Sequence, residues 1–203
     1  KPGKELAVAV QEAIRSRSTA PSVLILGNHG LVIGAEDASG ARQLISDVVA
    51  RLRQTPRPSP TFDHDRMSRW QSRFPDLAYQ PVALLRTHAL ALDPVALELV
   101  RDNWVLMPDH AVFLGARALV LNPQEDAVKL LRAWDEPPAC LIVEGVGVLT
   151  RNGLDKNALG LLDCFAEVVL RQQSATTVTP LTPDQVTELI GWEAEKYRRS
   201  LSK

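Results

Sequence analysis

The stretch Leu24-Ile25-Leu26-Gly27-Asn28-His29-Gly30-Leu31-Val32-Ile33-Gly34 decides the fold of the first part of the chain. Two short apolar runs flank Gly-Asn-His-Gly, and each has the length and composition of a buried strand. Asn-His-Gly is typical of a tight turn, which can join only antiparallel neighbours. We therefore predict a β-hairpin, called here the first hairpin.

The turn places His29 at the rim of the predicted sheet, and two interpretations of this residue stay open. An imidazole between two glycines has free space around it and is suited to bind a metal or to act as a general acid or base. Alternatively, the stretch is a hairpin turn in which Asn28 and Gly30 take positive φ and His29 is an exposed residue without chemistry. The residue types alone favour neither interpretation.

The sequence of residues 24–34, followed by a predicted helix over residues 37–53, resembles the C-terminal part of the class II aldolase/adducin family. In that family the histidine of Asn-His-Gly binds a catalytic divalent metal, usually zinc. The resemblance implies that His29 is a metal ligand and that a small sugar phosphate is the substrate of an aldol cleavage. The other family ligands include a His-x-His pair upstream, and this chain contains no His-x-His. We therefore assign no catalytic residue.

A later stretch repeats the pattern of the first hairpin. Residues 138–149 align without a gap on residues 21–32, and a predicted helix precedes and follows each stretch. A short unit repeated in this order indicates a structural repeat. Val146 stands where His29 stands, and a valine can neither bind a metal nor move a proton. We predict a second hairpin that keeps the architecture and lacks the chemistry.

A proline-rich stretch divides the chain. Residues 54–61 contain three prolines, which continue neither a helix nor a central strand and favour an extended linker. We predict an aldolase-like part at 1–54, a linker at 55–61 and a degenerate aldolase-like domain at 62–203. This domain ends in a helix whose start, Thr182-Pro183-Asp184-Gln185, has the pattern of a capping box.

The predicted fold class is α/β. The pattern of strands and helices indicates a largely antiparallel central sheet between helical layers, a three-layer α/β/α arrangement in which the two hairpins can belong to related halves. Residues 108–113, 143–148 and 192–198 are similar to the later half of longer bacterial proteins of the rhamnulose-1-phosphate aldolase/alcohol dehydrogenase type. No Gly-x-Gly-x-x-Gly lies between a strand and a helix, so no dinucleotide-binding domain is predicted.

Three further histidines have open roles. His64 lies in Asp-His-Asp, where we predict Asp63 as a helix cap and an exposed His64 rather than a metal site. His88 lies among apolar residues in a segment, 81–92, that we predict as one or two strands. His110 lies in another predicted pair of strands, 105–115, where we interpret it as a turn residue.

Composition excludes several classes of partner. The 203 residues carry a net charge of −1, which gives no electrostatic case for nucleic acid or an anionic membrane. No apolar run approaches the roughly 18 residues of a transmembrane helix. Cys140 and Cys164 lie in apolar patterns, which predicts buried free thiols and a cytoplasmic protein.

Two functions remain open for the whole chain. One is an enzyme of the class II aldolase type, dependent on zinc or another divalent metal, or a piece of that enzyme. The other is a non-catalytic aldolase/adducin-like scaffold or interaction module, since a fold alone does not confer activity. The chain begins at Lys1 and enters a predicted helix almost at once, so we expect a fragment of a longer protein. The resemblance also implies a homo-oligomer.

Overall fold

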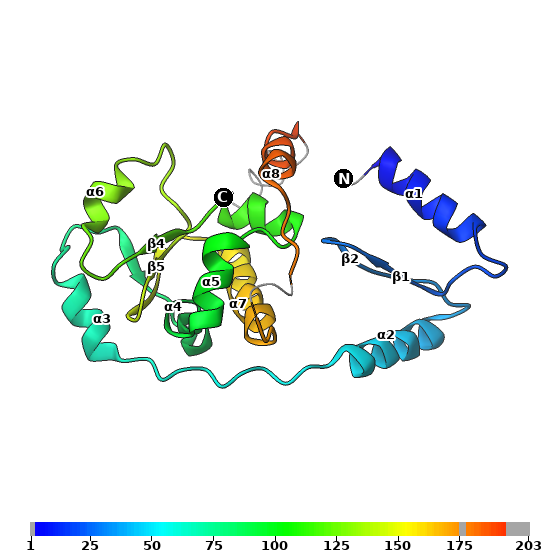
Figure 1. Cartoon of the computed structure of the whole chain (residues 1–203), viewed down its shortest axis with the longest axis horizontal. Coiled ribbons are helices and arrows are strands. Elements are labelled where there is room, and N and C mark those ends of the chain that lie inside the picture. The colour runs from blue at the N-terminus through cyan, green and yellow to red at the C-terminus, as the bar shows by residue number, and fades with distance from the viewer. Residues whose placement is uncertain (1–2, 175–177, 194–203) are drawn as a thin grey trace. The chain divides into compact units, whose positions relative to one another are not determined.

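The chain folds into two compact units, residues 1–54 and 55–203 (Figure 1). The structure is a computed structural model that describes residues 3–174 and 178–193. Both units combine helices with an open sheet, which agrees with the predicted α/β class. Each unit is described by itself below.

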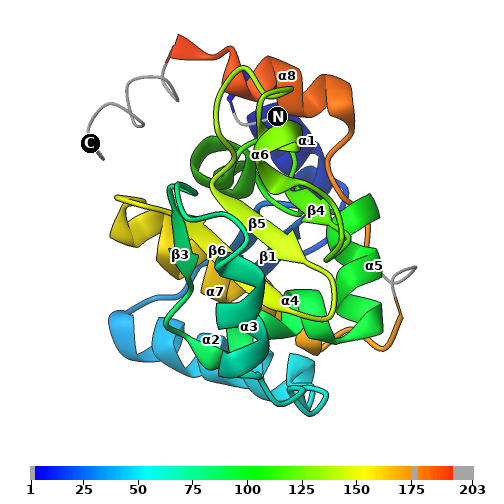
Figure 2. The same ribbon diagram turned by 90° about the vertical axis from the view of Figure 1, so that its left-hand side faces the viewer.

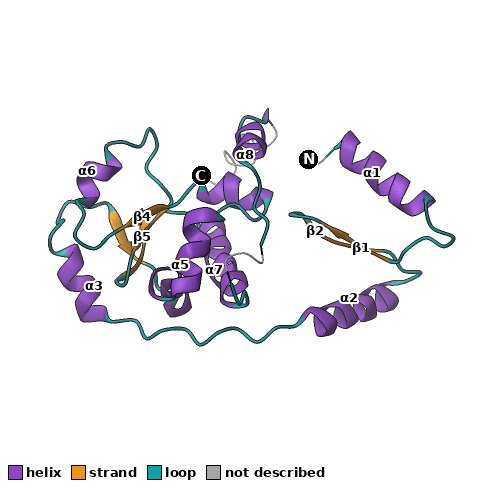
Figure 3. Cartoon of the chain, viewed as in Figure 1, coloured by secondary structure: helices purple, strands orange, loops and turns teal. Residues whose placement is uncertain are grey.

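The first unit consists of the first hairpin and a helix on either side of it in sequence. Its elements are α1 (Lys4–Arg15), β1 (Val23–Leu26), β2 (Gly30–Ile33) and α2 (Ala38–Leu52). The strands pair antiparallel, as predicted. The carboxylate of Asp37 accepts a hydrogen bond from the Gly40 N–H at 2.7 Å, which caps the N-terminus of α2. Figure 3 shows the hairpin and both helices, followed by a long loop that leads to the second unit.

The second unit is built on a four-stranded sheet in the order β3-β6-β5-β4 (Figure 2). Only β4 and β5 run parallel, so the sheet is largely antiparallel, as predicted. The strands are β3 (Tyr79–Pro81), β4 (Leu119–Leu121), β5 (Cys140–Val143) and β6 (Gly147–Arg151). The helices are α3 (His64–Gln71), the 3₁₀ helix η1 (Leu85–His88), α4 (Ala89–Leu92), α5 (Pro94–Asp102), the π-helix η2 (His110–Leu114), α6 (Ala127–Leu131), α7 (Lys156–Leu170) and α8 (Pro183–Ile190).

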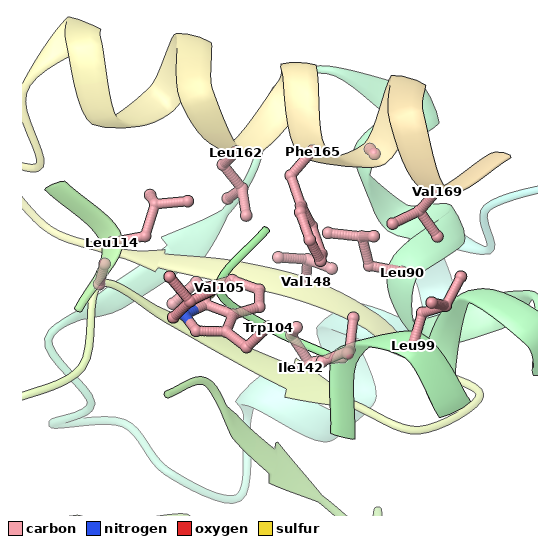
Figure 4. Packing of buried hydrophobic residues seen from close by; sticks show 14 of the residues in the cluster. Leu90, Leu99, Trp104, Val105, Leu114, Ile142, Val148, Leu162, Phe165 and Val169 are labelled. Carbon is pink, nitrogen blue, oxygen red and sulfur yellow. The ribbon is translucent and has the colours of Figure 1, made fainter. Parts of the chain in front are cut away.

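Both faces of this sheet are covered, which explains why β5 is apolar throughout and why β6 is buried from Gly147 to Thr150. On one face, Phe165 of α7 packs over Ile142 and Val148, together with Leu162 and Val169 of the same helix (Figure 4). On the other face, the alternate strand residues pack against the side chains of α3. That cluster contains Met67, Trp70, Tyr79, Leu121, Leu141, Val143, Val146 and Leu149.

Two segments predicted as strands are helical. Within residues 81–92 only Pro81 belongs to a strand, and η1 and α4 occupy residues 85–92. The segment 105–115 contains η2 instead of two strands. Residues 87–92 and 110–114 are mostly buried and mostly apolar, and in such a stretch a buried helix and a buried strand have the same sequence pattern.

The proline-rich stretch predicted as a linker belongs to the second unit and makes specific contacts with the rest of it. The Arg57 N–H donates a hydrogen bond to the carbonyl of Leu170 at 2.7 Å. The Arg57 guanidinium donates to both carboxylate oxygens of Asp93, at 2.6 and 3.2 Å. Burial alone would raise the pKa of Asp93, but these bonds and one from the Ala96 N–H outweigh it and lower the pKa. Part of this stretch is thus held by an ion pair.

Candidate functional site

The turn of the first hairpin has the geometry that the sequence predicts. Leu26 pairs with Gly30, and the His29 N–H donates a hydrogen bond to the carbonyl of Leu26 at 3.0 Å. Asn28 has a φ of 56° and Gly30 a φ of 143°, so the predicted positive φ values are confirmed. The backbone on both sides of His29 is therefore fixed by the turn.

The side chain of His29 is exposed, and its ring has no hydrogen bond or ion pair with any residue that the structure describes. A catalytic zinc takes three protein ligands, and a structural zinc takes four. Among residues 3–174 and 178–193, no three or more His, Cys, Asp and Glu side chains come together as a possible metal site. The described residues therefore offer a single imidazole and do not fit a complete metal centre.

The second hairpin reproduces the first in register and turn geometry. Val143 pairs with Gly147 as Leu26 pairs with Gly30, and all four paired positions correspond. Gly145 and Gly147 have φ values of 66° and 150°, close to those of the first turn. The Val146 N–H donates to the carbonyl of Val143 at 2.9 Å, as His29 does to Leu26. The predicted repeat of the hairpin is thus confirmed.

Val146 occupies in the second hairpin the position that His29 occupies in the first. Its side chain is 2% exposed and belongs to the core cluster beneath α3. Because the turn is packed, an apolar residue stabilises it there. This hairpin serves as architecture, and His29 has no counterpart with chemistry.

The side chain of His88 forms a hydrogen bond with the outer edge of β6, the second strand of the second hairpin. Its Nδ1 accepts a hydrogen bond from the Val148 N–H at 3.0 Å, so the proton lies on Nε2, which donates to the carbonyl of Val82 at 3.1 Å. The ring stacks on Phe62 with centroids 3.6 Å apart. Burial lowers the pKa of His88 to about 4. His88 is a neutral, structural residue whose role the sequence did not reveal.

Gly147 makes room for this contact. A Cβ at Gly147 would lie 2.8 Å from Nδ1 of His88, 2.8 Å from Met67 and 2.9 Å from Phe62. The positive φ of the residue also favours glycine. The imidazole, the aromatic ring and the strand therefore fit together only without a side chain at this position.

The two remaining histidines differ in burial. His64 is exposed in the first turn of α3, and the Asp63 carboxylate caps that helix through the Arg66 N–H at 2.9 Å, as predicted. His110 is fully buried in η2, which contradicts its interpretation as a turn residue in a pair of strands. Its ring stands edge-on to Phe165, and burial lowers its pKa to about 4.

The cysteines are both free thiols, but only one is buried. Cys140 lies in β5, and burial raises its pKa to about 12. Cys164 is exposed, so its predicted burial is wrong. Its neighbours on the outer side of α7 are Asp163 and Glu167, which form ion pairs with Arg86. The prediction failed because many sequence neighbours of Cys164 are apolar, although its own side of the helix is polar.

Two further findings bear on the class of protein. In the described ranges, no helix is long and apolar enough to span a bilayer. No protein-family model, no curated protein and no solved structure matches this chain.

Proposed function

We propose that this chain is a class II aldolase-like protein in which His29 is one ligand of zinc or another divalent metal. The reaction is the aldol cleavage of a small sugar phosphate. The proposal rests on one observation: an exposed His29, without a partner among the described residues, projects from an Asn-His-Gly turn held by its backbone. An imidazole of this kind is a common metal ligand.

One imidazole does not make a metal centre, so the proposal requires further ligands. These come from outside the described residues or from another subunit of a homo-oligomer. The three-layer α/β/α arrangement of the family belongs to the same proposal, as does a cytoplasmic location. The two free thiols suit a reducing compartment and support that location.

A second candidate is a non-catalytic scaffold. One observation favours it: the chain keeps a complete second hairpin after replacing the histidine by the buried Val146. A hairpin with this register is therefore useful to the chain as structure alone. The scaffold function makes no use of His29.

Zinc binding separates the two candidates. The chain is purified without chelator and dialysed against buffered Zn²⁺, and the bound metal is measured by elemental analysis. Wild-type protein and His64→Ala, which removes another exposed histidine, should bind the same amount of zinc, whereas His29→Ala should bind less. Cobalt substitution gives a second readout, because nitrogen ligation changes the visible spectrum of Co²⁺. Equal binding by all three proteins would refute the assignment of His29.

Aldol cleavage is measured separately. Zinc-loaded wild-type protein is incubated with ketose phosphates, and the aldehyde released is detected by coupled reduction. If zinc binds through His29 but no cleavage is detected, the metal site is supported and the aldolase activity of this chain is refuted. Cleavage that His29→Ala abolishes and His64→Ala preserves would support the full proposal.

A further inference from the structure

A groove lies beside β4, the last strand on one side of the sheet in the second unit (Figure 2). It is lined by parts of three segments, 100–105, 116–120 and 179–187, and by Trp134. Its volume is about 1030 Å³, at the upper end of the roughly 300–1,000 Å³ that small-molecule sites occupy. We call it the β4 groove, and it has room for a ligand with a sizeable apolar body.

Two hydrogen bonds hold the walls of the β4 groove. Nε1 of Trp104 donates to the carbonyl of Gly115 at 3.1 Å, which fixes the segment that leads into β4. The Leu181 N–H donates to the carbonyl of Val105 at 2.8 Å, which fixes the segment that leads into α8. Trp104 and Val105 are neighbours in sequence and both are buried. Both walls are therefore attached to the same buried pair of residues, and the groove is preformed.

Arg117 brings a positive charge without a carboxylate partner to the groove. Its guanidinium carbon lies over the ring of Trp134, 4.3 Å from the ring centroid, in a cation–π contact. The guanidinium makes no hydrogen bond or ion pair with any residue in the ranges 3–174 and 178–193. The contact with the ring restrains Arg117 while its N–H groups keep no acceptor. A guanidinium in this state is suited to bind a carboxylate through two N–H groups.

Val120 adds a backbone donor on the same wall. The Leu121 carbonyl accepts a hydrogen bond from the Glu144 N–H at 2.9 Å, so the backbone groups of Leu121 face β5. Because these directions alternate along a strand, the N–H of Val120 points to the outer edge of β4, where Val120 lines the groove. This N–H has no partner among the described residues. Arg117 and Val120 thus offer donors only three positions apart in sequence.

The other charged side chains of the groove favour a ligand with a single negative charge. The Arg101 guanidinium already donates to the Glu144 carboxylate at 2.6 Å. The carboxylate of Asp102 also lines the groove and disfavours a second negative charge on a ligand. Much of the remaining lining is apolar, and it includes Leu181 and Val186. The groove therefore combines one free cation with an apolar surface.

We propose that the β4 groove binds a small organic monocarboxylate with an apolar body. The guanidinium of Arg117 and the N–H of Val120 hold the carboxylate, and the apolar body lies along the lining that includes Leu181 and Val186. The site belongs to the second unit and uses neither a metal nor His29. It can therefore fail or hold independently of the proposed function.

Isothermal titration calorimetry with the full 203-residue chain, in the presence of a chelator, tests the proposal. The probes are 1-naphthaleneacetate, decanoate and 2-(1-naphthyl)ethanol, which has the naphthalene ring without the charge. Wild-type protein should bind 1-naphthaleneacetate more tightly than the alcohol. Arg117→Ala should weaken binding of the acid by about tenfold or more and leave binding of the alcohol unchanged, because only the acid pairs with the guanidinium. Arg132→Ala, at an exposed arginine outside the groove, should bind the acid as wild type does.

A second comparison tests the charge of the ligand. 1-Naphthyl phosphate has the same ring and carries up to two negative charges, so it should bind more weakly than 1-naphthaleneacetate beside Asp102. Tighter binding of the phosphate would refute the assignment to a monocarboxylate.

Three results would overturn the site itself. They are no saturable binding of 1-naphthaleneacetate or decanoate up to their solubility, equal affinity for the acid and the alcohol, and a loss of both alike in Arg117→Ala. Acid binding that Arg117→Ala weakens selectively supports the site. Because the chelator removes zinc from every sample, this result does not depend on the outcome of the zinc experiment.

Discussion

The imidazole of His88 and the backbone of Val148 form the contact that seals the outer edge of the second hairpin. The Val148 N–H donates to Nδ1 of His88 at 3.0 Å, in the middle of the core. The residues are 60 positions apart in sequence. Strand β3 ends at Pro81, and beyond it the side chain of His88 supplies the hydrogen-bond acceptor for the Val148 N–H of β6. This part of the sheet is therefore sensitive to a single substitution at His88.

His88→Ala should lower the free energy of unfolding of the second unit by about 3 kcal/mol, because it leaves a cavity and two unpaired backbone groups. Urea denaturation followed by tryptophan fluorescence reports this unit, since all four tryptophans lie in residues 55–203. His64→Ala, on the exposed face of α3, should change the value by less than about 0.5 kcal/mol. Equal effects would show that the His88 contact contributes nothing specific.

Two buried histidines predict a loss of stability on mild acidification. Burial lowers the pKa values of His88 and His110 from 6.5 to about 4 in the folded state. The unfolded chain therefore binds more protons between these values, and stability falls as the pH drops from 6.5 towards 4. Each histidine contributes at most about 3 kcal/mol to this loss.

Urea denaturation at several pH values between 7 and 4.5 measures this slope. His110→Gln should flatten it by removing one of the two titrating groups. Asp93 and Asp163 have lowered pKa values, so their contributions are lost only at lower pH and do not disturb this window. An unchanged slope in His110→Gln would mean that His110 is not held neutral by the fold.

The two hairpins and the helix caps of this chain were predictable from its sequence. Asn-His-Gly fixed an antiparallel hairpin, and the gap-free alignment of residues 21–32 on 138–149 found the repeat, because turn chemistry and strand pattern are local signals. Thr182 and Gln185 form the predicted capping box, with the Thr182 N–H donating to the Gln185 side chain at 2.9 Å. Residues 194–198, part of the stretch 192–198 that is similar to longer bacterial proteins, lie outside the described residues.

What the sequence did not show depends on contacts between distant segments. The sequence around Arg57 predicts a linker, and only the fold brings Asp93 beside it. The sequence around His88 predicts a strand, and only the fold brings the Val148 N–H of β6 within hydrogen-bond distance of its ring. The helical nature of residues 87–92 was hidden for a related reason, since a mostly buried segment loses the periodicity that separates helix from strand. The candidate site is local, and His29 was found because its turn is local.

Gly147 should tolerate alanine much less than another glycine with positive φ. Gly147→Ala places a Cβ against His88, Met67 and Phe62, in addition to the backbone strain. Gly153→Ala has the same kind of strain, with a φ of 76°, and open space around its Cβ. We expect a loss of roughly 1 kcal/mol for Gly153→Ala and of at least about 3 kcal/mol for Gly147→Ala.

Tryptophan fluorescence during urea denaturation compares the two glycine variants under one set of conditions. A restoring variant sharpens the test: His88→Ala combined with Gly147→Ala should lose less stability than the two single changes added together, because the smaller side chain gives room to the new Cβ. Strict additivity would mean that the imidazole and the glycine are not packed against each other.

Arg57 should stabilise the second unit through its ion pair with Asp93. Both side chains are mostly buried, and Arg57→Ala removes two hydrogen bonds from the Asp93 carboxylate and one from the carbonyl of Val169. Because the bond from the Ala96 N–H remains, we expect a loss of about 2 kcal/mol at neutral pH. Arg132→Ala, at an exposed arginine, should change the unfolding free energy by less than about 0.5 kcal/mol.

The same contact predicts a pH dependence and a change in proteolysis. The folded pKa of Asp93 is lowered, so the stabilisation is complete above its ordinary value of 3.8 and is lost as the pH falls towards the folded pKa. Arg57→Ala should therefore differ from wild type at pH 7 and approach it under strongly acidic conditions. Release of residues 55–61 from the second unit should also speed their cleavage by a protease of broad specificity. Equal cleavage rates in wild type and Arg57→Ala would show that the proline-rich stretch is not held by this ion pair.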